Sequence, residues 1–144
     1  QTAITLPTTT SQQVTTATTA PSTTTTTTLA PEAAITAFIG EFAAAIAAED
    51  TDWLLDHLNS AMILGYGEDL CRNFINAEIL ELTQYTVTGS VVGPVSKTLT
   101  TGVGDVTVSG IYTAETSFVF KGSQFDAKAD FVLGDSVTWL AICR

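Results

Sequence analysis

Residues 68–92 read EDLCRNFINAEILELTQYTVTGSVV, and the pattern that decides the fold changes within them. In the first half, Leu70 and Phe74 recur at the spacing of one helix face, which predicts a helix over 68–80 with both side chains facing the core. Cys71 and Ile79 are further candidates for inward positions. From Tyr85 onward the sequence is rich in threonine, valine and aromatic residues, which favour strands. We therefore predict helices before this point and β-structure after it.

Upstream of this point, the pattern predicts two further helices. The first begins at Pro31, a residue that suits a first helical turn, and its apolar residues recur on a single face. The second is short, with Thr51 as its N-cap, and the GYG at 65–67 breaks it. The apolar face of the first helix consists of Ile35, Phe38, Ile39, Phe42 and Ile46.

Downstream, turn signals divide the chain into four or five antiparallel strands. The clearest alternation is FDAKADFVL, 125–133, and the last strand, SVTWLAICR, 136–144, is apolar on both faces and is predicted to be central. The sequence thus predicts an α+β fold, with three N-terminal helices packed on one face of a curved antiparallel sheet. The turn signals are VGP (92–94), TGVGD (101–105), KGSQ (121–124) and LGDS (133–136).

The first thirty residues differ sharply in composition from the rest. They hold fifteen threonines and no charged residue, whereas all fifteen acids and all five bases lie between Glu32 and Arg144. We predict a Thr- and Pro-rich extended arm or linker over 1–30 and one domain over 31–144.

Charge and cysteine content limit the classes of partner. The net charge of −10 argues against a nucleic-acid or anionic-membrane partner. No stretch approaches the ~20 apolar residues that span a bilayer. Cys71 and Cys143 lack the spacing of a metal site, so we expect no metal; in an exported protein they would form a disulfide, and otherwise two buried free thiols. A start at Gln1 suits a mature chain whose signal peptide has been removed, so we expect an extracellular or cell-surface location.

The runs FAAAIAAEDTDWLLDHL (42–58) and YGEDLCRNF (66–74), followed by a β-only half that ends in a cysteine, resemble the nuclear transport factor 2-like superfamily. This superfamily is also called SnoaL-like or ketosteroid isomerase-like, and the likeness is strongest to its secreted bacterial members. The resemblance covers 31–144 and implies a cone-like sheet around a pocket. The expected pocket lining is Phe125, Ala129, Phe131 and Leu133.

Some members of that superfamily use an Asp/His pair for proton transfer. The single histidine, His57, lies near Asp52, Asp56 and Glu49 in sequence and is the candidate general base. A lone histidine on a short amphipathic helix more often serves in packing or at the surface, and Asp126 and Asp130 are expected to point away from the pocket. We therefore predict a protein that is not an enzyme, with no catalytic residue and no cofactor.

The arm allows three interpretations: a tether, an O-glycosylated stalk, or a strand that pairs with the sheet edge of another copy. Our first hypothesis is an exported structural protein, the subunit of a homo-polymeric extracellular filament whose contacts the arm makes. Its apolar anchors would be Ile4, Leu6, Val14 and Leu29. The glycan or spacer segment would be Thr23, Thr24, Thr25, Thr26, Thr27 and Thr28. The alternative is a monomeric cell-surface domain that binds a small molecule on a glycosylated tether.

Overall fold

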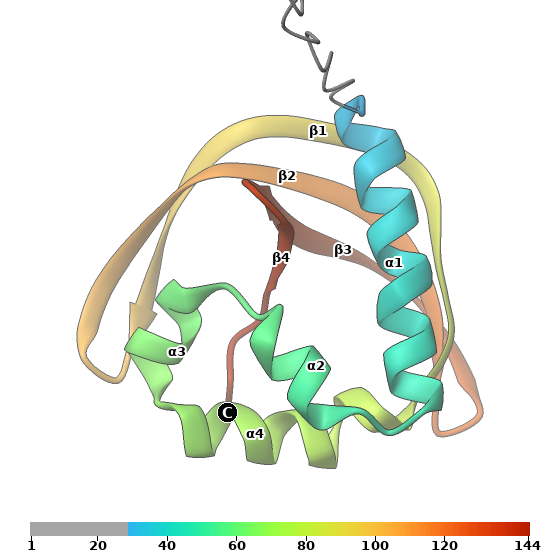
Figure 1. Ribbon diagram of the computed structural model, residues 1–144, viewed down its shortest axis with the longest axis horizontal. Helices are drawn as coiled ribbons and strands as arrows, with labels where there is room; N and C mark the ends of the chain where they lie inside the picture. The colour runs from blue at the N-terminus through green and yellow to red at the C-terminus, as the bar shows by residue number, and fades with distance from the viewer. Residues whose placement is uncertain (1–28) are drawn as a thin grey trace, which may run out of the picture.

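The computed structural model describes residues 29–144, and within them four helices and a 3-10 turn are followed by a four-stranded antiparallel sheet (Figure 1). The predicted α+β class is confirmed, with the lower of the two predicted strand numbers. The sheet order follows the sequence, β1-β2-β3-β4. The elements are α1 Pro31–Ala47, α2 Thr51–Asp56, α3 Ser60–Tyr66, α4 Glu68–Ala77, η1 Ile79–Glu81, β1 Leu82–Thr101, β2 Gly104–Phe120, β3 Ser123–Leu133 and β4 Val137–Leu140.

Helix α1 forms where the sequence predicts it. Pro31 occupies its first turn, and Ala30 before it has the extended backbone that a following proline favours. The predicted apolar face is buried against the sheet and α2, with Phe38 in edge-on contact with Phe131 of β3 and Phe42 in edge-on contact with Trp139 of β4. This face therefore holds α1 against the sheet.

The second predicted helix consists of two helices, and its predicted cap is wrong by one residue. Asp50 caps α2 by accepting a hydrogen bond from the Trp53 amide at 3.0 Å, while the Thr51 hydroxyl donates to Asn76 of α4 instead. A new helix, α3, then starts behind Asn59, whose side chain accepts from the Ala61 amide. The predicted break at the GYG is confirmed, because α3 ends at Tyr66.

The third predicted helix is shorter than expected. It ends at Ala77, and the separate turn η1 follows. The inward position predicted for Leu70 is wrong: this side chain is 44% exposed, and Cys71 and Ile75 form the buried face. The reason is the disulfide between Cys71 and Cys143, which turns the Cys71 side of α4 toward the core.

Three of the four turn signals are confirmed as the links β1–β2, β2–β3 and β3–β4, at 102–103, 121–122 and 134–136. The fourth, VGP at 92–94, does not end a strand. Strand β1 continues through it with shifts of register and a cis Gly93–Pro94 peptide. Gly93 has φ 150° and lies against the backbone of Ile111 and Tyr112, where a side chain has no space.

Strand β4 is at the edge of the sheet, so the prediction that it is central is wrong. Its backbone is nevertheless bonded on both sides. Beyond β3, the Asn59 amide donates to the Trp139 carbonyl at 2.8 Å, and the Trp139 amide donates to the His57 carbonyl at 3.0 Å. The link between α2 and α3 thus takes the place of a fifth strand along the outer edge of β4.

The two cysteines form the expected disulfide. Both are fully buried, and the bond joins α4 to the segment that follows β4. In Figure 1 this C-terminal segment ends at α4. Within residues 29–144, no helix is long and apolar enough to cross a membrane.

Candidate functional site: an aromatic pocket

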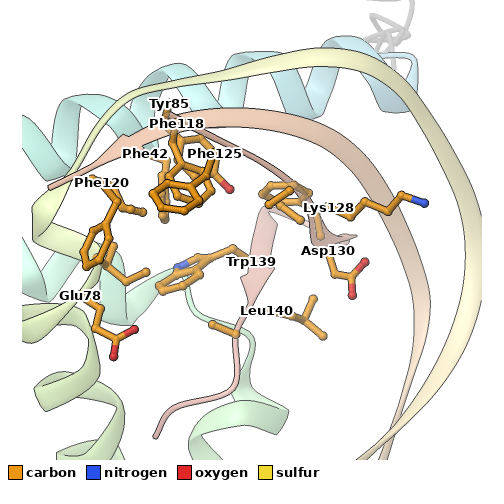
Figure 2. Close-up of a pocket in the computed structure, with 16 residues that line it drawn as sticks. Phe42, Glu78, Tyr85, Phe118, Phe120, Phe125, Lys128, Asp130, Trp139 and Leu140 are labelled. Carbon is orange, nitrogen blue, oxygen red and sulfur yellow. The ribbon is translucent and has the colours of Figure 1, made fainter. Parts of the chain in front are cut away.

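A pocket with a volume of about 450 Å³ lies between α1, the start of β1, the β2–β3 hairpin and β4 (Figure 2). Seven of its lining residues are aromatic, and they come from five different elements. Its lining consists of Phe42, Glu78, Ile79, Leu82, Tyr85, Phe118, Phe120, Phe125, Ala127, Lys128, Ala129, Asp130, Phe131, Trp139, Leu140 and Ala141.

Four of these rings form a continuous series of contacts, which we call the aromatic column: Phe42, Tyr85, Phe118 and Phe125. Phe42 and Tyr85 have ring centroids 5.3 Å apart; Tyr85 and Phe118 are nearly parallel at 5.5 Å; Phe118 and Phe125 are stacked at 5.9 Å. The last two are cross-strand partners in the β2–β3 hairpin, so strand register brings them together. Phe125, at the end of the column, is 46% exposed.

Two further rings lie beside the column, Phe131 and Trp139, which are partners across β3 and β4. The Trp139 indole N–H donates to the Leu54 carbonyl at 2.8 Å. Because this polar atom is already bonded, Trp139 presents only apolar ring surface to the pocket.

The phenol of Tyr85 is the polar group of the aromatic column. Burial raises the pKa of Tyr85 above its ordinary value, and a hydrogen bond with Thr116 lowers it in part. The phenol is therefore neutral at physiological pH and able to donate or accept a hydrogen bond.

This raised pKa predicts a pH dependence of stability. A group whose pKa is higher in the folded than in the unfolded protein stabilises fully below its unfolded pKa, about 10 for tyrosine, and this contribution is lost as pH rises through the folded pKa. We expect the free energy of unfolding to fall more steeply between about pH 9 and pH 11 in the original protein than in Tyr85→Phe. Urea unfolding of both proteins in the same buffers measures the difference, and equal slopes would contradict it.

Charged side chains occupy the rim of the pocket. The charged ends of Glu78 and Lys128 lie on opposite sides of the aromatic group (Figure 2). Asp130 also belongs to the lining, contrary to the prediction that it points away, whereas Asp126, for which the same prediction was made, does not. The Asp130 carboxylate accepts from the Lys97 ammonium at 2.7 and 2.8 Å and from the Thr113 hydroxyl at 2.6 Å. This carboxylate is therefore already neutralised by its own partners.

Of the residues predicted to line a pocket, the structure brings three together and leaves one outside. Phe125, Ala129 and Phe131 are part of the lining. Leu133 is not, because it pairs with Val137 beside the β3–β4 turn, past the end of the pocket.

The proposed general base lies elsewhere. His57 is half-buried at the end of α2, with Nδ1 2.8 Å from the Trp53 carbonyl and its ring stacked on Trp53 at 3.9 Å. It is not among the residues that line the aromatic pocket. Of the carboxylates near it in sequence, Asp52 binds Arg72 at 2.7 Å. These contacts give His57 a packing role on α2.

Other predicted positions are not all described. Leu29 is 56% exposed just before α1. Ile4, Leu6, Val14 and the six threonines 23–28 lie outside the described residues. Within residues 29–144 there is no group of three or more His, Cys, Asp or Glu that could hold a metal ion.

Of the seven aromatic residues that line the pocket, five were not predicted from the sequence: Phe42, Tyr85, Phe118, Phe120 and Trp139. Alternation in TSFVF, 116–120, indicates that Phe118 and Phe120 share a face. The contribution of Phe42 from α1 carries no comparable signal, because a buried helical phenylalanine has the same pattern whether it lines a cavity or fills a core.

No protein-family model matches the chain, and no curated protein or solved structure matches it either. The fold and the site define an α+β domain with one disulfide and an aromatic pocket.

Proposed function

We propose that residues 31–144 form an extracellular binding domain that holds a small, flat, apolar molecule in the aromatic pocket, joined to an uncharged arm that acts as a tether. The aromatic column carries this proposal. Flat ligands stack on ring faces, and Phe125 offers such a face at the pocket opening. The disulfide supports export, because such bonds persist in oxidising compartments.

The size and polarity of the pocket define the ligand class. Its volume of about 450 Å³ lies within the ~300–1,000 Å³ of small-molecule sites. Asp130 is bonded to Lys97, so the charged groups at the rim that have no ion pair among residues 29–144 are Glu78 and Lys128, on opposite sides of an otherwise aromatic lining. A polycyclic molecule with at most one or two polar atoms fits these properties. The likeness to the nuclear transport factor 2-like superfamily, with its cone-like sheet, agrees with a binding role and remains a proposal.

Blocking the pocket is expected to weaken binding of Nile red, a flat, neutral fluorescent probe, by at least about tenfold. The blocking change is Ala129→Trp, which places an indole inside the lining. A second change, Phe125→Ala, removes the exposed ring that ends the column. Because Phe125 is 46% exposed, this variant is expected to fold normally.

Titration of probe emission against protein concentration measures the effect, with circular dichroism to verify folding. Ala37→Trp adds the same indole at an exposed position of α1 and is expected to bind as the original protein does. If Ala129→Trp and Phe125→Ala both fold and bind the probe with unchanged affinity, the pocket is not the binding site.

A second candidate function is the homo-polymeric extracellular assembly. The observation that favours it is the edge position of β1, which pairs only with β2 among residues 29–144. Val92 and Val95 on this strand are 60% and 46% exposed. In this proposal the protein is structural, it is its own partner, and any O-glycans on Thr23–Thr28 act as spacers.

A further inference from the structure

We infer that residues 2–6 of a second copy, TAITL, add as a strand to the outer edge of β1 at residues 95–99. This inference rests on the second candidate function and names the two surfaces that would meet. Segment 95–99 is called the open edge below.

The open edge begins directly after Pro94, and the register of its pairing with β2 shifts between Val95 and Lys97, but its lysine does not protect it in the usual way. Native edge strands often carry a lysine whose charge blocks further pairing. Lys97 lies in the open edge, but its ammonium is 2.7 and 2.8 Å from the Asp130 carboxylate of β3, so its charge is directed back across the sheet. The Tyr66 hydroxyl donates to the Thr100 carbonyl at 3.2 Å, so α3 closes the edge just beyond 99.

The two faces of the open edge differ in chemistry. On one face, exposed hydroxyls form a ladder with β2: Ser96 bonds to Ser109 at 3.1 Å, and Thr98 bonds to Thr107 at 2.9 Å. By the alternation of a strand, Val95, Lys97 and Leu99 belong to the other face. An added strand would therefore need hydroxyl or small residues on one face and apolar residues on the other.

Residues 2–6 have this alternation. Ile4 and Leu6 fall on one face of an extended TAITL, and Ala3 and Thr5 fall on the other. Ile4 and Leu6 would cover the exposed Val95, and Thr5 would extend the ladder of cross-strand hydroxyl pairs, which are a favourable pairing in sheets. Backbone hydrogen bonds supply the remaining affinity, as in other cases of strand addition.

Charge favours the arm over any other part of a second copy. All charged residues lie between Glu32 and Arg144, and they sum to −10, so two domains repel each other. The uncharged arm can approach the acidic domain of another copy without electrostatic repulsion. The arm of the same chain is the less suitable occupant, because the open edge lies on the opposite side of the molecule from α1 (Figure 1).

Two pairs of variants of the full chain test the inference by analytical ultracentrifugation over a wide range of concentration. Ile4→Glu places a charge in TAITL, and Ser11→Glu places the same charge outside it. Val95→Lys places a charge on the open edge, and Val103→Lys places it on another exposed valine of the same hairpin. We expect Ile4→Glu and Val95→Lys to raise the concentration at which self-association occurs by at least about tenfold, and the two controls to leave it within about threefold.

Each other result overturns the inference in a different way. A full chain that stays monomeric at all concentrations removes the assembly function together with this contact. If Ile4→Glu weakens association and Val95→Lys does not, the arm still assembles copies but binds elsewhere. If Val95→Lys alone weakens it, the open edges pair with each other. Amide hydrogen exchange distinguishes a last case. If the amides of 95–99 exchange slowly in the monomer and faster in Ile4→Glu, the edge holds the arm of its own chain.

Discussion

Replacing Trp139 with alanine is expected to lower the free energy of unfolding by about 3–5 kcal/mol, the usual range for removal of a buried tryptophan. Trp139 is 4% exposed and lies in edge-on contact with Phe42 of α1. Its backbone is bonded to His57 and Asn59, and its indole N–H to Leu54. One residue therefore connects β4 to α1, to α2 and to the link between α2 and α3, and its loss leaves a cavity among all of them.

Urea unfolding with a fluorescence or circular-dichroism signal measures this loss. Trp139→Phe is the matched variant, because it keeps most of the ring but leaves the Leu54 carbonyl without its donor. We expect a smaller loss for it, about 1–3 kcal/mol. If the alanine variant loses less than about 1 kcal/mol, Trp139 is not the junction of helices and sheet.

Removing the disulfide is expected to have the second-largest effect. Cys71 and Cys143 are 72 residues apart, and a cross-link that closes a loop of this length stabilises by up to about 4 kcal/mol in the chain-entropy model. For a domain of this size, that corresponds to a decrease in melting temperature on the order of 15 °C. The physical cause is the larger conformational freedom of the unfolded chain once residue 143 is no longer joined to α4.

The double variant Cys71→Ala, Cys143→Ala, compared with the original protein in thermal unfolding, measures this contribution. The control is a reducing agent, which should lower the melting temperature of the original protein and leave that of the double variant unchanged. A double variant that melts within about 3 °C of the original protein would show that packing alone holds the C-terminal segment.

The two positions are close enough to be coupled. Cys143 follows Trp139 by four residues, and Leu140 and Ala141 between them line the pocket. Because one short segment provides a disulfide, a core tryptophan and part of the pocket, the binding site depends on how firmly this segment is held.

Much of the fold could be predicted from the sequence. Local periodicity and turn residues depend only on neighbouring positions in the sequence. They predict the buried face of α1, the change from helix to strand after residue 80 and three of the four turns. The shared face of Phe125, Ala129 and Phe131 follows from strand alternation in the same way. The change from an uncharged to a charged composition at Glu32 can likewise be read directly from the sequence.

Other features could not be predicted, because they depend on contacts between distant segments. Leu70 is exposed because a disulfide to residue 143 turns α4, and the α2–α3 link covers β4 through bonds between Trp139 and residues 57 and 59. The sequence by itself therefore determined the class of fold, the charge boundary at Glu32 and the shared face of Phe125, Ala129 and Phe131. Only the tertiary structure decided which face of α4 is buried, where β4 lies and which rings meet in the aromatic column, because periodicity says that a side chain is buried but not which distant side chain it is buried against.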